Sequence, residues 1–438
     1  MIHPSTRTLV SELPSHVGRT VTVNGWVRTS RLQRTMQFVL LRDHTGTVQL
    51  THRRDGSAIE AALEGAAVES AVRVTGTVVA NPAVKLGGLE LLPESVEVLA
   101  PAAGPLPVDE QSGPEHRQDW RFLDLRRRPA AGLALTVAST LEQGLREYAL
   151  AQGCTELHTP KLMATASESG AEVFKLDYFG GAAYLAQSPQ FYKQTAIAAG
   201  IDRVFEVGPV FRAEPSYTSR HATEFTGVDV ELGWTAGVEE VQAFEEGMIA
   251  HALALVAERH GARIREEFGV EVTVPATPFP RITMADAQQR LRAAGWDPEG
   301  EKTDLDPAGE RLLAELVGEE TGHEFVFVTH YPSEIRPFYH ARPAGRPDLT
   351  LSFDLLWRGL EVTTGAQREH RHEVLAEQAV EKGMALESLA DYLNNFRYGC
   401  PPHGGFGMGL NRMLMVLLGL ASIRDAVFLF RGPNRLTP

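Results

Sequence analysis

FRAEPSYTSRHATEF, residues 211–225, is the stretch on which the prediction of the fold depends. It opens with Arg212 and Glu214, passes through a turn-rich piece, and returns through Arg220 and His221 into the apolar-alternating run 223–232. This order predicts two strands joined by a loop, with two arginines facing one another across the hairpin. Two guanidinium groups held together repel unless an anion lies between them, and their planar forks suit phosphate or carboxylate. A surface hairpin with salt-bridged arginines is the alternative.

Length and composition limit the kind of protein. A chain of 438 residues is too long for one core, so two or three domains are expected. An apolar content of 43% without any run near the roughly 20 apolar residues of a membrane span favours a soluble protein with no membrane partner. The N-terminus has no apolar core of the signal-peptide type. Cys154 and Cys400 lack metal-ligand spacing, so we expect no disulfide, no zinc and a cytoplasmic location.

The net charge of −14 is unevenly distributed. Residues 19–54 hold seven arginines and a single acidic residue, so a basic patch lies on an acidic chain and could attract a polyanion. Five short strand-like runs and one helix-like piece within residues 20–100 predict a small closed barrel of the OB-fold type. Such barrels bind single-stranded nucleic acid on aromatic side chains above a basic groove. Trp26 and Phe38 lie among the arginines, although a place in the barrel core is the alternative for each.

The composition of the chain and its pattern of expected helices and strands change after the barrel. We predict an OB-fold domain over residues 1–103, a linker or hinge rich in Pro, Gly and polar residues over 104–127, and a second domain over 128–438. Helices interleaved with strands that lack regular βαβ spacing indicate an α+β fold in which an antiparallel β-sheet is flanked by helices. Residues 263–322 read as an inserted helical segment with little chemistry in view.

A glycine-rich run, residues 404–409, leads directly into an apolar helix expected over 407–420 that contains Arg412. Bare backbone before a helix N-terminus allows a nucleotide to come close, and the helix end favours negative charge. Arg412 could stack on a base or hold a phosphate. Glycines used only for a turn are the alternative.

Three oxygen-bearing side chains, Asp354, Glu361 and Thr364, fall on two expected strands. Carboxylates and a hydroxyl are hard ligands that suit Mg²⁺ bound to phosphates, whereas a solvated or salt-bridged acidic pair is the alternative. Arg368 follows four residues later and could hold a carboxylate with two hydrogen bonds.

Two further segments carry candidate binding groups. In QSPQFYK, residues 187–193, Gln190 and Lys193 share one helical face near Ser188, which would suit a substrate with two carboxylates. TASESGA, residues 165–171, is small and flexible around Glu168 and could be a lid that closes over a substrate amine. An exposed helix start and a plain surface loop are the alternatives.

Together these stretches resemble a known family. Thr159-Pro160-Lys161, FRAE…RHATEF (211–225) and GFGMGLNRM (405–413) resemble the three motifs of class II aminoacyl-tRNA synthetases, in family order and after an OB-like barrel. The likeness covers nearly the whole chain. QSPQFYK and TTGAQREHRH (363–372) resemble the aspartate branch in its archaeal and eukaryotic form. The resemblance implies a catalytic domain that activates L-aspartate with ATP and transfers it to tRNA-Asp, with tRNA-Asn as a possible second substrate.

The resemblance also implies roles for individual residues. The catalytic residues would be Arg212, Glu361 and Arg412. Aspartate would be bound by Glu168, Ser188, Gln190, Lys193, Arg212, Asp229, Thr364 and Arg368. ATP would be bound by Arg212, Glu214, Arg220, His221, Phe225, Glu361, Gly409 and Arg412. Mg²⁺ would be held by Asp354, Glu361 and Thr364. The tRNA would be bound by Trp26, Arg28, Phe38, Gln49, Lys85 and Glu90. Pro160 would lie at the interface of a homodimer.

Two other functions remain open from the sequence. An asparagine–tRNA ligase of the same subgroup is the nearer one, and Lys193 argues against it because asparagine enzymes typically lack this lysine. A non-catalytic tRNA-binding paralogue is the other, although such a relative would be expected to lose motif residues that this chain keeps. The third motif departs from the family at Asn411, where a glutamate is frequent. Trp26 and Lys85 match positions associated with the choice of tRNA and favour tRNA-Asp.

Overall fold

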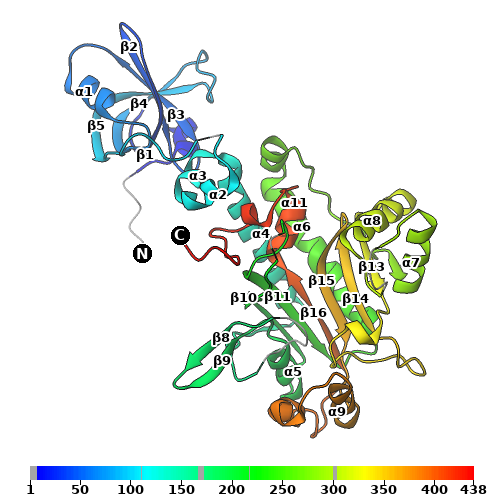
Figure 1. Ribbon diagram of the computed structural model, residues 1–438. Coiled ribbons are helices and arrows are strands. Elements are labelled where there is room, and N and C mark those ends of the chain that lie inside the picture. The colour runs from blue at the N-terminus through cyan, green and yellow to red at the C-terminus, as the bar shows by residue number, and fades with distance from the viewer. Residues whose placement is uncertain (1–6, 110, 166–171, 217, 299–302) are drawn as a thin grey trace. The chain divides into compact units, whose positions relative to one another are not determined.

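The computed structural model describes residues 7–109, 111–165, 172–216, 218–298 and 303–438. The chain divides into two compact units, Met1–Arg128 and Pro129–Pro438 (Figure 1). The segment expected to be a linker, 104–127, groups with the first unit and carries two short helices, α2 (Pro114–Asp119) and α3 (Arg121–Arg127). Within the described residues, no helix combines the length and the apolarity that crossing a bilayer requires.

The first unit is a closed five-stranded barrel, as predicted. Its elements are the 3₁₀ helix η1 (Val10–His16), β1 (Thr20–Leu32), β2 (Met36–Arg42), β3 (Thr47–Arg53), α1 (Ala58–Gly65), β4 (Ala71–Ala80) and β5 (Leu89–Ala100). The strand order is β1-β2-β3-β5-β4, and only the β3–β5 pair is parallel among the pairs that close the barrel. Alternating residues of β1, among them Val21, Val23 and Val27, fill the interior and leave the intervening side chains outside.

The second unit is built on an eight-stranded sheet in the order β12-β13-β14-β15-β16-β11-β10-β6. Its strands are β6 (Thr155–Glu156), β10 (Arg203–Phe211), β11 (Glu224–Gly233), β12 (Arg281–Thr283), β13 (Phe325–Thr329), β14 (Ser352–Trp357), β15 (Leu360–Gln367) and β16 (His403–Gly409). Neighbours from β13 to β10 run antiparallel, as expected, but the edge pairs β12–β13 and β10–β6 are parallel. The sheet is therefore mixed at its two edges. A small separate sheet contains β7 (Leu162–Met163), β8 (Lys175–Tyr178) and β9 (Gly181–Leu185).

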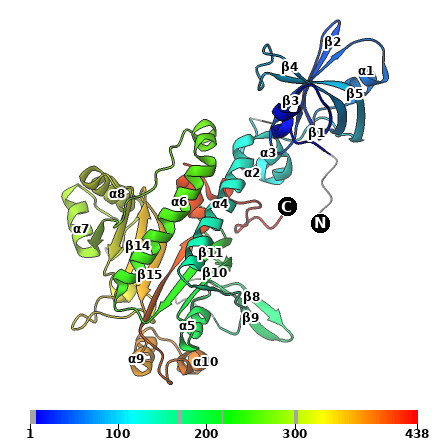
Figure 2. The ribbon, with the colours of Figure 1, turned by 180° about the vertical axis from the view of Figure 1, so that it is seen from behind.

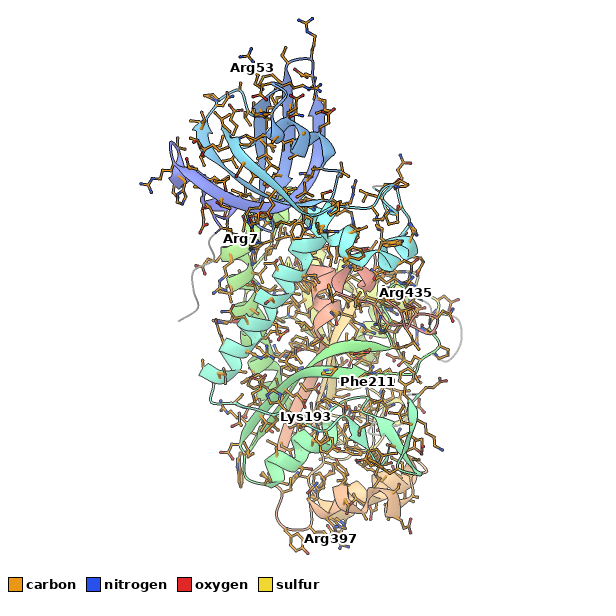
Figure 3. All side chains as sticks on the ribbon, turned by 90° about the vertical axis from the view of Figure 1, so that its left-hand side faces the viewer. Arg7, Arg53, Lys193, Phe211, Arg397 and Arg435 are labelled. Atoms are coloured by element: carbon orange, nitrogen blue, oxygen red, sulfur yellow. The ribbon has the colours of Figure 1, made fainter. Side chains whose placement is uncertain are left out.

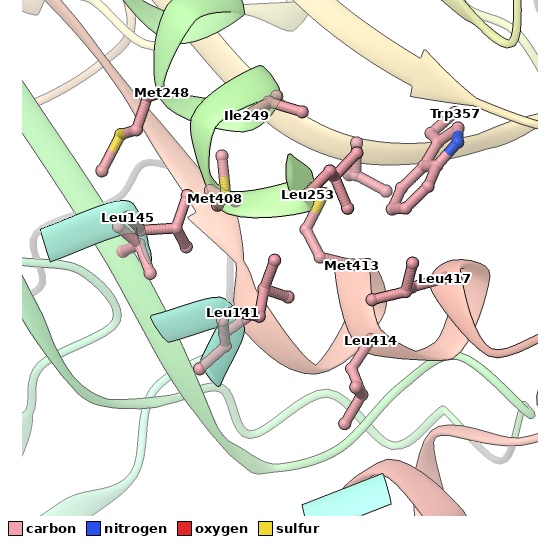
Figure 4. Packing of buried hydrophobic residues seen from close by; sticks show 14 of the residues in the cluster. Leu141, Leu145, Met248, Ile249, Leu253, Trp357, Met408, Met413, Leu414 and Leu417 are labelled. Carbon is pink, nitrogen blue, oxygen red and sulfur yellow. The ribbon is translucent and has the colours of Figure 1, made fainter. Parts of the chain in front are cut away.

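Three helices cover one face of this sheet. They are α4 (Pro129–Ala151), α6 (Val238–Phe268) and α11 (Leu410–Leu417), and α4 and α6 lie side by side across the strands (Figure 2). In Figure 4, Leu141 of α4, Met248 of α6, Met408 of β16 and Met413 of α11 converge on one apolar core. A side chain at Gly144 would meet Ala252 Cα at 2.7 Å, so this glycine allows α4 and α6 to pack closely.

The remaining helices lie at the edges and the lower end of the sheet in Figure 1. They are α5 (Gln190–Ala198), α7 (Met284–Ala293), α8 (Pro307–Thr321), α9 (His372–Glu381) and α10 (Ala390–Asn394). The segment 263–322 is thus only partly a helical insertion, because α6 continues to Phe268 and β12 joins the sheet. Helix α9 begins at His372, four residues after Arg368, which forms an isolated bridge with His340 just beyond the end of β15.

The glycine-rich run forms a strand that leads into the predicted helix. Residues 403–409 form β16 between β15 and β11, and the helix begins at Leu410 instead of residue 407. A side chain at Gly405 would lie 2.1 Å from the Val230 carbonyl oxygen and 2.3 Å from Glu231 Oε2. The glycines therefore make room for neighbouring groups within the sheet.

One acid is completely buried in the helical layer. Glu245 lies on α6, which packs against β15, and its side chain has no solvent exposure. Burial raises the pKa of Glu245 to about 8, and the negative charges of Glu246 and Asp354 act in the same direction. The carboxyl group is therefore protonated at neutral pH.

This burial predicts a pH-dependent stability. The unfolded chain releases the proton near pH 4.5, whereas the folded protein keeps it to about pH 8, so folding is disfavoured progressively across that range. Glu245→Gln preserves the shape of the neutral acid and removes the group that can ionise. The difference in free energy of unfolding between this variant and the wild type should therefore increase, in favour of the variant, by up to about 1.4 kcal/mol per pH unit as pH rises from about 5 to about 8.

Urea unfolding at each pH measures this difference. Glu240→Gln, at an exposed position of the same helix, is the control and should show a constant difference. A constant difference for Glu245→Gln as well would mean that Glu245 is ionised in the folded protein.

Candidate active site

The predicted hairpin is confirmed. Strands β10 and β11 pair antiparallel from Arg203↔Leu232 to Phe211↔Glu224, and the Arg212 backbone N–H donates to the Thr223 carbonyl at 3.0 Å just beyond the paired strands. Side chains of β11 alternate between the two faces of the sheet. Val228 and Val230 join the apolar core under the helices, so the residues between them face the other side.

A cavity of about 300 Å³ opens on that other side. Its walls come from the hairpin, from β15, β16 and α11, and from the segment before α5. Most of the residues singled out from the sequence line it: Ser188, Gln190, Arg212, Glu214, Arg220, His221, Phe225, Asp229, Glu361, Thr364, Arg368, Gly409 and Arg412. The structure thus brings together side chains that are more than 200 positions apart in the sequence.

Cations and an aromatic ring dominate one end of the cavity. The Arg212 guanidinium lies 5.5 Å from the centre of the Phe225 ring, and Arg412 Nη1 donates to the Glu361 carbonyl oxygen at 3.2 Å. Burial, assisted by the positive charge of Arg412, lowers the pKa of His221, so the imidazole is neutral. Three fixed arginines, with Arg220 as the third, suit a ligand that carries several negative charges.

Four charged side chains form a buried charge cluster, Lys193, Asp229, Glu231 and Arg368, at the other end. Lys193 Nζ lies 3.0 Å from Asp229 Oδ1 and 3.3 Å from Glu231 Oε2, and Arg368 Nε donates to Glu231 Oε1 at 2.9 Å. Burial alone would raise the pKa of Glu231, but Arg368 and Lys193 outweigh it and lower that pKa. The cluster holds two positive and two negative groups, so its charges balance.

Lys193 does not lie where direct contact with a substrate was expected. It projects from α5 toward the strands (Figure 3), is 3% exposed, and also donates to the carbonyl oxygens of Val230 and Phe406. Asp229 and Glu231 are two residues apart on one strand, so both carboxylates point at it. Arg368 and Asp229 are the cluster members that line the cavity, and Lys193 supports them from behind.

The expected metal ligands divide into two groups. Glu361 and Thr364 line the cavity, whereas Asp354 does not and accepts a 2.5 Å hydrogen bond from Arg336 Nη2. Arg336 Nη1 also donates to Thr364 Oγ1 at 3.1 Å, and its guanidinium lies 3.6 Å from the centre of the Tyr331 ring. Arg336 thus occupies one oxygen of Asp354, Oδ2, whereas Oδ1 is buried without a hydrogen-bond partner, and contact between Asp354 and a metal ion stays a prediction.

Glu361 and Thr364 still fit Mg²⁺. Within the described parts of the chain, no group of three or more His, Cys, Asp or Glu side chains is placed to hold a metal. Mg²⁺, however, commonly takes one or two protein oxygens together with substrate phosphates and water. Burial and the charge of Asp354 raise the pKa of Glu361, so an added cation would relieve the cost of ionising it.

Sequence reasoning missed several residues of the site. Arg336, Tyr339 and His340 line the cavity and come from the connection between β13 and β14. Glu231 was missed too, although its spacing of two from Asp229 on a strand was a usable signal. Asn411, the departure from the third motif, is buried: it accepts from the Thr226 N–H and donates to the Ala426 carbonyl, so it holds α11 in place.

The residues expected to bind tRNA lie on the barrel unit. Phe38, Thr51, Gln49 and Glu90 are neighbours across β2, β3 and β5, and the Thr51 hydroxyl bridges Gln49 to Glu90 with bonds of 3.1 and 2.6 Å. Arg28 and Lys85 are exposed. Trp26 differs, because it is half-buried and the Arg126 guanidinium lies 5.2 Å from its ring centre.

Two expectations concern the loops between β6 and β8. Pro160 is exposed, and it lies between Thr159 and Lys161, which both bind the carboxylate of Glu206 at 2.6 and 2.7 Å. Glu168, on the expected lid, lies outside the described residues.

Comparison with known proteins agrees with this geometry. Residues 113–431 match the family of class II tRNA synthetases (D, K and N), and residues 21–99 match the OB-fold nucleic acid binding domain. The chain therefore belongs to the class II tRNA synthetases of the D, K and N group.

Particular relatives are similar over nearly the whole chain. The aspartate–tRNA(Asp/Asn) ligase of Aeropyrum pernix is 41% identical over 437 residues, 98% of each chain. The aspartate–tRNA(Asp) ligase of Thermococcus kodakarensis is 40% identical over 428 residues, 96% of this chain and 97% of the relative. Among solved structures, the asparaginyl-tRNA synthetase of Pyrococcus horikoshii in complex with asparaginyl-adenylate has a TM-score of 0.91 at 34% identity and full coverage of both chains.

The buried charge cluster predicts a large cost for removing one member. Glu231→Gln takes away the negative charge that Lys193 and Arg368 share, and breaking a buried pair commonly costs about 3–5 kcal/mol. We expect a loss of this order in the free energy of unfolding at pH 7, measured by urea denaturation. Glu224→Gln, exposed on the same strand, should change stability by less than about 0.5 kcal/mol. A loss below about 1 kcal/mol for Glu231→Gln would show that the cluster does not depend on this charge.

Proposed function

We propose that the protein is an aspartate–tRNA ligase, which activates L-aspartate with ATP and transfers it to the 3′ end of a tRNA. One observation carries the proposal: a single cavity has arginines and an aromatic ring at one end, and it is lined at the other end by Arg368 and Asp229 of the buried charge cluster. The first end suits a nucleotide, and the second suits an amino acid that carries a carboxylate on its side chain. The family membership and the named relatives support the same function.

The reaction needs positioning more than a protein nucleophile. A carboxylate oxygen of aspartate attacks the α-phosphorus of ATP, the bond to the bridging oxygen breaks, and pyrophosphate leaves with its electron pair. The terminal ribose hydroxyl of the tRNA then attacks the carbonyl carbon of the adenylate and AMP leaves. Holding two anions in line and neutralising their charge accounts for this kind of catalysis.

The nucleotide end would act through three arginines and one ring. Arg212, next to Phe225, would bridge the α-carboxylate of aspartate and the α-phosphate. Phe225 and Arg412 would enclose the adenine from its two sides. Arg220 and the neutral His221 would hold the outer phosphates.

Other groups would complete the nucleotide end. Glu214 would contact the adenine, and Gly409 would allow close approach of the nucleotide. Glu361 and Thr364 would hold Mg²⁺, which when bound neutralises phosphate charge. Asp354 would support this pair from behind, since Arg336 links its Oδ2 to Thr364.

The amino acid end would select a carboxylate. Asp229 would receive the substrate ammonium and Arg368 the side-chain carboxylate, while Lys193 keeps the two in place from below. Ser188 and Gln190 would support the substrate from the wall of the cavity. Asparagine offers a neutral amide in place of the carboxylate, so it would form a weaker hydrogen bond with the Arg368 guanidinium.

The barrel would bind the anticodon of the tRNA. Phe38 would stack on a base beside Gln49 and Glu90, and Arg28 and Lys85 would contact the backbone or neighbouring bases. We also place the protein in the cytoplasm as a homodimer with Pro160 at the interface, and Glu168 on a lid over the amino acid.

Aspartate-dependent exchange of pyrophosphate into ATP tests the proposal. The wild type should exchange with L-aspartate at least about a hundredfold faster than with L-asparagine. Arg212→Ala should abolish exchange without changing the unfolding transition, whereas Arg203→Ala, exposed at the start of the strand that leads to Arg212, should leave it intact. Faster exchange with asparagine would identify an asparagine–tRNA ligase, and no exchange with any amino acid would indicate a non-catalytic tRNA-binding protein.

The choice of tRNA is a separate prediction. Trp26 and Lys85 favour tRNA-Asp alone, so purified tRNA-Asp should be charged with aspartate and purified tRNA-Asn should not. The measurement is the initial rate of aspartylation of each tRNA at equal concentration. Comparable rates for the two tRNAs would show that the protein charges both.

A further inference from the structure

Helix α8 places one carboxylate behind the nucleotide end of the cavity. Glu310 Oε2 lies 2.8 Å from Arg220 Nη1, and the two residues are 90 positions apart. Glu310 is 7% exposed and does not line the cavity, whereas Arg220 does. The segment 263–322, which carried no chemistry in the sequence, therefore reaches the site through this ion pair.

We propose that Glu310 is a positioning residue that orients the Arg220 guanidinium for the phosphates of ATP. This inference rests on the proposed function. Among the described residues, the Arg220 side chain pairs with Glu310, which contacts a single nitrogen of the guanidinium. The other nitrogens remain available to a ligand in the cavity.

Arg220 needs such a partner because its own segment is irregular. It lies in the loop between β10 and β11, where its backbone N–H donates to Thr218 Oγ1 at 3.3 Å. A long arginine side chain on a loop samples many rotamers, and a ligand must then stop that motion when it binds. A carboxylate that fixes the guanidinium beforehand removes this cost from ATP binding.

Glu310 is itself held firmly at the start of its helix. Asp306 caps α8 by accepting from the Gly309 N–H at 2.7 Å, and Asp306 also accepts from Trp296 Nε1 at 3.0 Å. A side chain at Gly309 would come within 3.0 Å of the Trp296 ring, so the first turn is packed tightly. The Glu310 carboxylate therefore projects from a rigid helix toward Arg220 on the loop between β10 and β11.

The charges around Glu310 agree with a structural link to the phosphate end. The pKa of Glu310 is raised to about 7, chiefly by burial; the positive charges of Arg220 and of Arg412 on α11 oppose this rise, and the negative charge of Glu361 on β15 adds to it. A buried carboxylate of this kind is costly unless a cation accompanies it. Arg220 supplies that cation, so each group of the pair depends on the other.

The test compares Michaelis constants in aspartate-dependent pyrophosphate exchange. Glu310→Ala should raise KM for ATP about tenfold and KM for aspartate less than about twofold, and Glu310→Gln, which keeps the shape but loses the charge, should give a smaller rise. The double variant Arg220→Ala/Glu310→Ala should match Arg220→Ala alone, because Glu310 acts through Arg220. Glu315→Gln, exposed on the same helix, is the control and should match the wild type.

Three outcomes would overturn the inference. They are an unchanged or lower KM for ATP in both Glu310 variants, an equal rise in the two Michaelis constants, and effects of Arg220→Ala and Glu310→Ala that multiply. If Glu310→Ala fails to fold, Glu310→Gln decides by the same comparison. A wild type without exchange would instead refute the proposed function itself, so the two failures are distinguishable.

Discussion

Four buried charges, two positive and two negative, set the conditions for everything else in the cavity. Lys193 and Arg368 neutralise Asp229 and Glu231 beneath its floor, so none of the four is left unpaired in a poorly solvated place. The two cluster members that line the cavity also fit the proposed substrate. Arg368 and Asp229 present one positive and one negative group to the cavity, which matches the side-chain carboxylate and the ammonium of aspartate.

The strands and helices of the second unit place these four charged groups. Strand β11 sends valines into the helical core and carboxylates to the cavity, so the apolar packing of α4, α6 and α11 fixes the depth of the charged groups. The neighbouring strand β16 is glycine-rich because Glu231 and a carbonyl occupy the space that a side chain would need at Gly405. At the other end, the hairpin supplies arginines that other elements hold in place, among them α8 through Glu310.

Local chemistry explains what could be predicted from the sequence. The hairpin and the barrel follow from patterns within short windows, and the structure bears them out, although Arg220 lies in the connecting loop of the hairpin. The errors arose where distant segments meet. Nothing near Asp354 shows that Arg336 will occupy it, and nothing near Lys193 shows that two carboxylates of β11 will surround it. The strand at residues 403–409 was not predicted, because the cause of its glycines, the crowding by Glu231, lies on another strand.

The central claim is that fixed charges in one cavity gather ATP and aspartate for reaction with each other. A crystal structure with a non-hydrolysable analogue of aspartyl-adenylate tests it most directly. We expect the adenine between Phe225 and Arg412, the phosphate mimic at Arg212, and the side-chain carboxylate at Arg368. An analogue bound elsewhere, or one whose side-chain carboxylate lies away from Arg368, would contradict the account.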